Sequence, residues 1–279
     1  MAYKSILSVL TDPARVEASL AAATVIAAQE DAHVDVLSLG IDRTQVGYAY
    51  LGSAPALIEV SIERAEADAA ELDKAARAYL DRQDVRWGAE AAVAQLGGLG
   101  PLVELKARFA DLVVLPRPYG KGRGPEGEAV LEASLFEGQA PVLVVPDGGL
   151  AGPIGKRVVI AWNEGREAMA AVRRALPWLK QADVVNITVI DPPPSSPERS
   201  DPGGMLCQML VRHGVKAEVS VLAKTAPRVS DVLAQQARDV NADLVVMGAY
   251  GHSRLREAIL GGATRDMLEN AALPVFLAH

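Results

Sequence analysis

An internal repeat is the feature that most constrains how this chain of 279 residues can fold. Both halves open on a Lys-led apolar run, continue into an Ala-rich helical stretch, and later carry the same pentapeptide, Ala-Asp-Leu-Val-Val. Five pairs of matching segments carry the repeat: 4–11 with 156–163, 13–30 with 164–180, 33–39 with 183–190, 110–114 with 242–246, and 141–145 with 274–278. Matching blocks in the same order and at similar spacing predict two copies of one fold.

Within each copy, short runs of Val, Ile and Leu alternate with longer helical patterns. Strands that are apolar throughout are typical of a sheet covered by helices on both faces, and strand–helix alternation gives parallel strands. We therefore predict an α/β fold of two tandem five-stranded parallel-sheet domains, residues 1–147 and 156–279, joined by a linker at 148–155. The strands are expected at 4–10, 34–40, 85–93, 111–116 and 141–145, and at 157–162, 183–190, 216–222, 242–248 and 274–278. A long helix is expected over 55–81, where the second copy has a Pro- and Gly-rich stretch.

Composition narrows the classes of function. The net charge of -7 argues against nucleic acid or an anionic membrane as the main partner, because both are bound through clustered Lys and Arg. No apolar run approaches the roughly 20 residues of a membrane span. The chain has one cysteine, Cys207, and its first residues lead directly into a strand pattern, so we expect a cytoplasmic protein without a secretory signal. Residues 1–150 carry a net charge of -9 and residues 151–279 a net charge of +2, which makes the second half the better host for a phosphate.

One loop carries chemistry: the segment that follows the fourth strand of the second copy. Parallel sheets bind ligands beyond the carboxyl ends of their strands. Glycines in such a loop let backbone N–H groups approach a phosphate, and a helix N-terminus attracts anions. The candidate residues of this segment are Gly248, Gly251, Ser253, Arg254, Gly261, Gly262, Ala263 and Thr264. An ordinary turn is the alternative explanation for glycines at these positions.

The order and spacing of these glycines resemble the universal stress protein family. Its nucleotide-binding members carry Gly, two residues, Gly, nine residues, Gly, and then Ser or Thr, which Gly248, Gly251 and Gly261 match. The resemblance extends over both copies and implies an adenine-nucleotide-binding fold and a role in stress response. It also implies a polar group near the ribose and base at Asn163, where binding members have Asp, and backbone contacts to adenine around Val189. Gly262 stands at the Ser or Thr position, and Thr264 replaces that hydroxyl only in part.

The first copy departs further from this pattern. Pro116 and Tyr119 align with the first two glycines, and Glu128-Ala129 aligns with the glycine pair, where an acid repels phosphate. The string Gly122–Gly127 reads G-x-G-x-x-G but lies several residues after the strand, which is the wrong context for a dinucleotide fingerprint. Thr11, with Asp12 beside it, takes the polar position after the first strand. We expect a degenerate site here, and the sequence leaves open whether the loop 41–55 covers the cleft.

We find no constellation that demands catalysis or a metal. The histidines lack neighbours at metal-ligand spacing, and Cys207 lies in an apolar helical pattern. The leading hypothesis is a non-enzymatic binding module that holds ATP or a related adenine nucleotide, with Mg²⁺ as its companion ion, in the second domain. A nucleotide-free scaffold that acts through unidentified protein partners is the second hypothesis, and a slow nucleotide hydrolase the third. By resemblance to the family's dimers, the domains should form an internal pseudo-dimer through strands 141–145 and 274–278; association into a homodimer is left open.

Overall fold

The computed structural model describes residues 3–43, 54–150, 152–193, 198–251 and 262–279, and the statements below concern these residues. They form two compact units. The first unit consists of 3–140 with 147–149, and the second contains 141–146 and 150–279. Each unit is described by itself. The division into domains at 147 and 156 stays a prediction, since the compact units group strand 142–145 with the second half of the chain.

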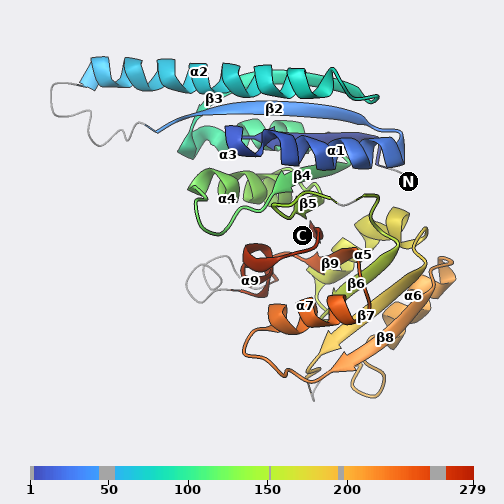
Figure 1. Ribbon diagram of the computed structural model, residues 1–279. Coiled ribbons are helices and arrows are strands. Elements are labelled where there is room, and N and C mark those ends of the chain that lie inside the picture. The colour runs from blue at the N-terminus through green and yellow to red at the C-terminus, as the bar shows by residue number, and fades with distance from the viewer. Residues whose placement is uncertain (1–2, 44–53, 151, 194–197, 252–261) are drawn as a thin grey trace. The chain divides into compact units, whose positions relative to one another are not determined.

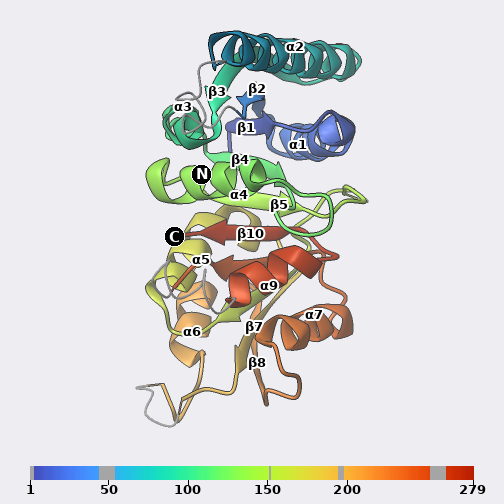
Figure 2. The ribbon, with the colours of Figure 1, turned by 90° about the vertical axis from the view of Figure 1, so that its left-hand side faces the viewer.

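The first unit is a parallel sheet with strand order β3–β2–β1–β4. Its elements are β1 (Ser5–Leu10), a 3-10 turn (Pro13–Arg15), α1 (Val16–Glu30), β2 (His33–Asp42), α2 (Ala54–Leu80), β3 (Arg86–Gln95), a 3-10 turn (Leu96–Gly98), α3 (Leu99–Ala107), β4 (Leu112–Pro116), α4 (Pro125–Glu132) and a π-helical turn (Ala133–Glu137). Figure 2 shows α1 and α3 on opposite sides of β1, so helices cover both faces of the sheet.

The second unit has the strand order β10–β9–β6–β7–β8, again all parallel. Its elements are β5 (Val142–Val145), β6 (Arg157–Trp162), α5 (Arg166–Leu179), β7 (Val184–Ile190), α6 (Gly204–Arg212), β8 (Ala217–Leu222), α7 (Val229–Asp239), β9 (Leu244–Gly248), α9 (Ala263–Asn270) and β10 (Val275–Ala278). β5 adds to this sheet in antiparallel register, with Val144 opposite Val275 and Val142 opposite Leu277. The predicted closeness of the two closing strands is therefore confirmed.

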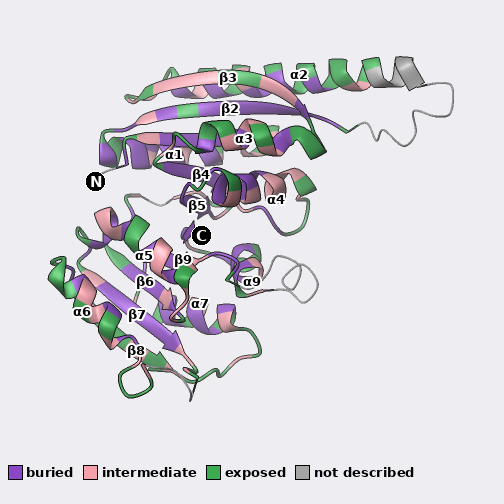
Figure 3. Cartoon of the chain, turned by 180° about the vertical axis from the view of Figure 1, so that it is seen from behind, coloured by how far each residue is buried: buried purple, intermediate pink, exposed green. Residues whose placement is uncertain are grey.

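The α/β fold and its strands are confirmed. Each predicted strand is present, although β2 and β3 extend beyond the predicted ends, to Asp42 and Gln95. The central strands are buried on both faces (Figure 3), as expected when the helices that connect parallel strands cover both sides of the sheet. In β4, for example, residues 112–114 have no exposed surface.

Helix α2 lies along β2 and β3 (Figure 1). Its buried residues recur at helical spacing, as a one-sided helix requires: Ala65, Ala69, Leu72, Ala76 and Leu80. Small residues let this helix approach the sheet closely. A Cβ placed on Gly40 of β2 would lie 1.8 Å from the carbonyl oxygen of Ala65, so only glycine fits at this crossing.

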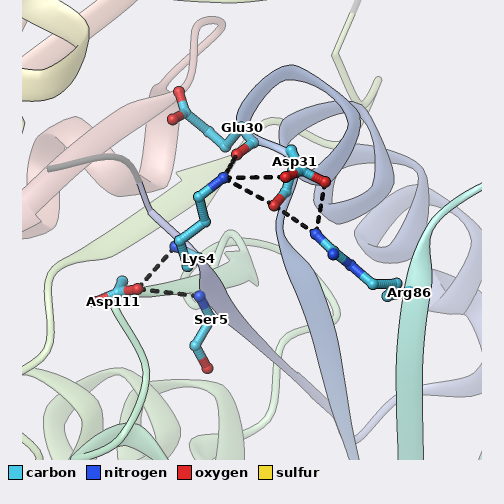
Figure 4. A network of polar contacts seen from close by, with 6 residues as sticks. All are labelled: Lys4, Ser5, Glu30, Asp31, Arg86 and Asp111. Carbon is cyan, nitrogen blue, oxygen red and sulfur yellow. Dashed lines mark hydrogen bonds and ion pairs between the residues drawn. The ribbon is translucent and has the colours of Figure 1, made fainter.

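The aspartate of the repeated pentapeptide has the same structural role in both units. Asp111 Oδ2 accepts hydrogen bonds from the backbone N–H groups of Lys4 and Ser5, at 2.8 and 3.0 Å (Figure 4). Asp243 accepts from the N–H groups of Gly155, Lys156 and Arg157, at 2.8 to 3.2 Å. Each carboxylate thus satisfies the donors at the start of the first strand of its repeat, β1 or β6, which explains why the pentapeptide recurs without invoking a ligand.

A second set of contacts in Figure 4 closes the same edge of the first unit. Lys4 Nζ donates to the carbonyl oxygens of Glu30 and Asp31, at 2.6 and 3.0 Å, where α1 ends. Asp31 is left-handed, with φ of 50°, and Arg86 of β3 donates to both its carbonyl and its carboxylate. These cationic side chains satisfy carbonyl groups at the helix C-terminus, where positive charge is favoured.

Candidate functional site

The candidate site lies at the carboxyl end of the second unit's sheet, between β6 and β9. From β6 the chain proceeds through α5 to β7 on one side, whereas β9 pairs with β6 on the other side. A reversal of strand order at this point leaves a crevice into which the following loops and helix N-termini project. Two helices begin here, α5 directly after β6 and α9 after the glycine-bearing loop.

Asn163 follows β6 and forms the turn into α5. Its side-chain Oδ1 accepts a hydrogen bond from the N–H of Gly165 at 3.0 Å, and Glu164 between them is left-handed with φ of 61°. This is an Asx turn, which asparagine forms readily. The oxygen is therefore used by the backbone, and the amide Nδ2 is the group that can donate to a ligand.

Gly248 ends β9 where the first turn of α5 crosses it. A Cβ placed there would lie 2.4 Å from the backbone nitrogen of Ala168 and 2.5 Å from the carbonyl carbon of Glu167. Contacts below 3.0 Å with backbone atoms require the backbone to shift. The glycine is thus needed for the packing of strand against helix, a reason distinct from the phosphate approach expected from the sequence.

Gly251 lies close to the carboxylate of Glu167. A Cβ on Gly251 would be 3.2 Å from Glu167 Oε2, and one on Gly165 would be 3.3 Å from the same oxygen. Glu167 belongs to the first turn of α5, where its negative charge interacts favourably with the positive end of the helix dipole. It stands at the edge of the sheet where the sequence predicts a phosphate site, and sequence reasoning missed it, since nothing in the spacing connects this position with the glycine loop.

Thr264 ties the glycine loop to α9. Its side chain is 3% exposed, and its Oγ1 accepts a hydrogen bond from the backbone N–H of Tyr250 at 3.2 Å. Tyr250 is left-handed, with φ of 54°. The bond brings Gly251 together with Gly262 and Ala263, the N-cap and first residue of α9. Residues Ser253, Arg254 and Gly261 lie outside the described residues.

Val189 lies inside the paired part of β7, with Trp162 and Val221 opposite it on the neighbouring strands. Its side chain is buried. The first residue beyond β7 is Asp191, which is left-handed and donates its N–H to the carbonyl oxygen of Leu222. The backbone groups that reach the edge of the sheet here are therefore those that follow Val189 rather than its own.

The corresponding crevice of the first unit has a different lining. Asp12 Oδ1 accepts from the N–H of Ala14 at the start of the 3-10 turn after β1. At the aligned glycine positions, Tyr119 donates its hydroxyl to Glu128 Oε1 at 3.2 Å. In the string 122–127, residues 122–124 lead into α4, with Gly122 at φ of 73°, and residues 125–127 form the first turn of that helix.

Comparison with known proteins shows a family match for the second half of the chain and a shared fold for the whole. The model of the universal stress protein family matches residues 155–279, which contain β6 to β10 and the glycine loop. Over its whole length the chain is similar in fold to a universal stress protein from Archaeoglobus fulgidus, with a TM-score of 0.68, 15% identity, and 98% of this chain and 95% of that chain covered. The second half of this chain therefore matches the universal stress protein family in sequence, and the whole chain shares the fold of a universal stress protein.

Other proteins are similar to this chain in fold or over part of its sequence. A putative universal stress protein from Pseudomonas aeruginosa has a TM-score of 0.58 with 15% identity, covering 99% of this chain and 93% of that chain. The Synechocystis sp. universal stress protein Slr1230 is 34% identical over 68 residues, so the match spans 24% of this chain and 23% of that relative. Another universal stress protein structure is a complex with cAMP; it covers 44% of this chain with 17% identity and a TM-score of 0.34.

Two features are absent from the described residues. Among them, no group of three or more His, Cys, Asp or Glu side chains is placed to bind a metal ion. No helix in the described part of the chain is long and apolar enough to cross a membrane.

Proposed function

We propose that the second unit of this protein binds ATP or a related adenine nucleotide, and that it acts in stress response as a binding module without turnover. One observation carries the proposal. The start of α5, Gly251 and the start of α9 are gathered at the strand-order reversal between β6 and β9, and the Tyr250–Thr264 hydrogen bond joins the glycine loop to α9.

Two helix N-termini supply the attraction for phosphate. Both helices follow a glycine N-cap, Gly165 and Gly262, and a glycine offers no side chain to cap the first N–H groups. Such groups, together with the positive end of each helix dipole, form an anion site. Asn163 Nδ2 would contribute a donor near the ribose and base, and backbone groups after Val189 would face the adenine. Mg²⁺ would accompany the nucleotide as a counter-charge to its phosphates.

A specific observation favours the alternative, a nucleotide-free scaffold that binds protein partners. Glu167 places a carboxylate beside Gly251, where it repels phosphate, and Gly248 already has a packing reason to be glycine. The two hypotheses differ in a measurable quantity. A ligand at about 100 times its Kd stabilises the fold that binds it by about 2.7 kcal/mol, whereas a scaffold gains nothing.

Thermal unfolding with and without millimolar ATP and Mg²⁺ tests the proposal, with ADP and cAMP as further probes. We expect ATP to raise the Tm of the second unit by roughly 5 °C or more. Gly251→Glu, which adds a second acid beside Glu167, should abolish the shift. The matched control is Gly100→Glu in α3, where an added Cβ meets nothing within 4 Å and the nucleotide shift should persist. No shift in the unaltered protein, together with no nucleotide released on denaturation, would favour the scaffold.

A further inference from the structure

The first unit contains a small cleft lined by charged side chains, of which the arginines are in the majority. It lies beyond the carboxyl ends of β1 and β4, where the strand order of that unit reverses, and has a volume of about 60 Å³. The loop after β1 forms one wall and the loop after β4 the other. For scale, a buried apolar cavity of about 150 Å³ holds benzene. The cleft is therefore too small to enclose a nucleoside and is of a size for a small inorganic ion.

Three guanidinium groups line this cleft, those of Arg15, Arg117 and Arg123, together with the carboxylates of Asp12 and Glu126. Glu126 Oε1 pairs with Arg43 at 3.0 Å. The three arginine side chains are 26%, 22% and 7% exposed, so Arg123 is essentially buried. Burial lowers the pKa of Arg123, and the nearby charges of Arg15 and Arg117 lower it further. A buried charge is stable only when it is paired, so each of these arginines needs an anionic partner.

A carboxylate of the chain itself pairs with two of these arginines. Asp147, just after β5, accepts hydrogen bonds from both Arg117 and Arg123, one to each carboxylate oxygen. Its side chain is 51% exposed, so it reaches the arginines from the rim of the cleft. Asp12 pairs with Arg15 in the same way. Two guanidinium groups converging on one carboxylate is also the geometry with which arginines bind an oxyanion.

A buried hydroxyl group in the same cleft is without a protein partner. Ser19, in α1, is 1% exposed and lines the cleft, and its Oγ has no hydrogen-bond partner among the described residues. A buried polar atom left unsatisfied costs about 1–3 kcal/mol, so such atoms are ordinarily bonded to protein, water or ligand. This hydroxyl can donate to an oxygen atom of a ligand within the cleft.

We propose that this cleft is a binding site for a small tetrahedral oxyanion, of which phosphate is the representative. Arg117 and Arg123 bind the anion, Ser19 donates to one of its oxygens, and Asp147 is the intramolecular counter-ion that the ligand displaces. The site uses side-chain guanidinium groups in place of a glycine loop. It is independent of nucleotide binding in the second unit.

Isothermal titration of the full-length protein with sodium phosphate tests the proposal, at constant ionic strength with chloride as the balancing anion. We expect weak, saturable binding in the unaltered protein. Asp147→Asn removes the competing carboxylate at nearly constant volume and should tighten phosphate binding at least tenfold. Arg123→Gln should weaken it at least tenfold, and Ser19→Ala severalfold. The control, Arg108→Gln, removes a surface arginine that pairs with Glu104 outside the cleft and should leave the affinity unchanged.

Two further arms keep the result decisive. The double variant Asp147→Asn/Arg123→Gln removes one charge of each sign, so it should fold even if Arg123→Gln does not, and it should lose the tightening. Glycerol 3-phosphate distinguishes a phosphate ester from the free ion, since equal affinity for both would show that the phosphoryl group is what is bound. Phosphate affinity that differs by less than twofold between Asp147→Asn and the unaltered protein overturns the proposal. Phosphate bound in the second unit would be insensitive to Arg123, so this result and the ATP-dependent Tm shift can fail separately.

Discussion

The two units place different chemistry at the same point of the same topology. In the second unit, glycines and two helix N-termini lie at the carboxyl edge between β6 and β9, with the acids Glu167 and Asp266 in the first turns of the two helices. In the first unit, the equivalent crevice is lined by arginines and closed by Asp147. One unit offers backbone N–H groups to an anion and the other offers side chains.

At the opposite edge, where the first strand of each repeat begins, the two units are alike. There, Asp111 and Asp243 bind the N–H groups that precede or open the first strand in both units. This edge is needed to begin the sheet, so the repeat keeps it. The carboxyl edge has no part in starting the strands, so its loops can diverge while the fold is unchanged.

The largest effect on stability should come from adding a side chain where β9 and α5 cross. Gly248→Ala should lower the free energy of unfolding by about 2–3 kcal/mol, because its Cβ would clash with the backbone of residues 167 and 168. Gly251→Ala is the matched change and should cost less than about 1 kcal/mol, since its Cβ would meet only a movable carboxylate. Urea unfolding measures both. If Gly248→Ala and Gly251→Ala were equally stable, Gly248 would not be required for packing, and ligand binding would be the remaining reason for a glycine there.

The next largest effect on stability should come from the two aspartates of the repeated pentapeptide. Asp243→Ala should destabilise the protein by about 2 kcal/mol, and Asp111→Ala by a similar or smaller amount, because Asp243 accepts three backbone hydrogen bonds and Asp111 two. Urea unfolding of the two variants compares the units directly. A loss for only one of them would mean that the repeated pentapeptide no longer has the same role in both halves.

The difference between the crevices can be sharpened at Glu167. Glu167→Gln should tighten ATP binding about threefold, because a carboxylate in the first turn of α5 repels phosphate there. Glu17→Gln in α1 is the matched control, since Glu17 occupies the first turn of the corresponding helix of the first unit. Isothermal titration with ATP gives both affinities. Weaker binding in Glu167→Gln would instead make Glu167 a ligand of Mg²⁺ or of the ribose.

The smallest effect concerns pH and the first crevice. Burial alone would raise the pKa of Asp147, but the hydrogen bond from Arg117 and the charge of Arg123 hold it below the ordinary value. A carboxylate whose pKa is lower in the folded state stabilises the fold above its unfolded pKa of about 3.9, and this contribution is lost as the pH falls through the folded pKa. Because Asp147 is half exposed, its share should be below about 1 kcal/mol. Unfolding of the unaltered protein and of Asp147→Asn at pH 7 and pH 3 should converge at the lower pH; a constant difference would contradict the assignment.

Most of the fold could be predicted from local pattern. Apolar runs such as Leu112–Leu115 indicate strands buried on both faces, and the repeated blocks fix their number and order. The extension of β2 to Asp42 could not be predicted, because it depends on pairing with β3, and Asp42 itself accepts a hydrogen bond from Ser61 of α2. These contacts join residues that are far apart in the chain.

For the candidate site, the sequence determined which residues of the second half can meet at one edge of a sheet, since the glycine spacing and the strand pattern are both local. Only the tertiary structure showed that Gly248 is required by a crossing helix, that the hydroxyl of Thr264 accepts a bond from Tyr250, and that Glu167 stands beside Gly251. Only the structure also brought Arg15, Arg117, Arg123 and Asp147 to one crevice. The physical reason is the same in each case: periodicity records how a segment buries its own face, whereas the neighbours of a side chain are set by the packing of segments distant in sequence.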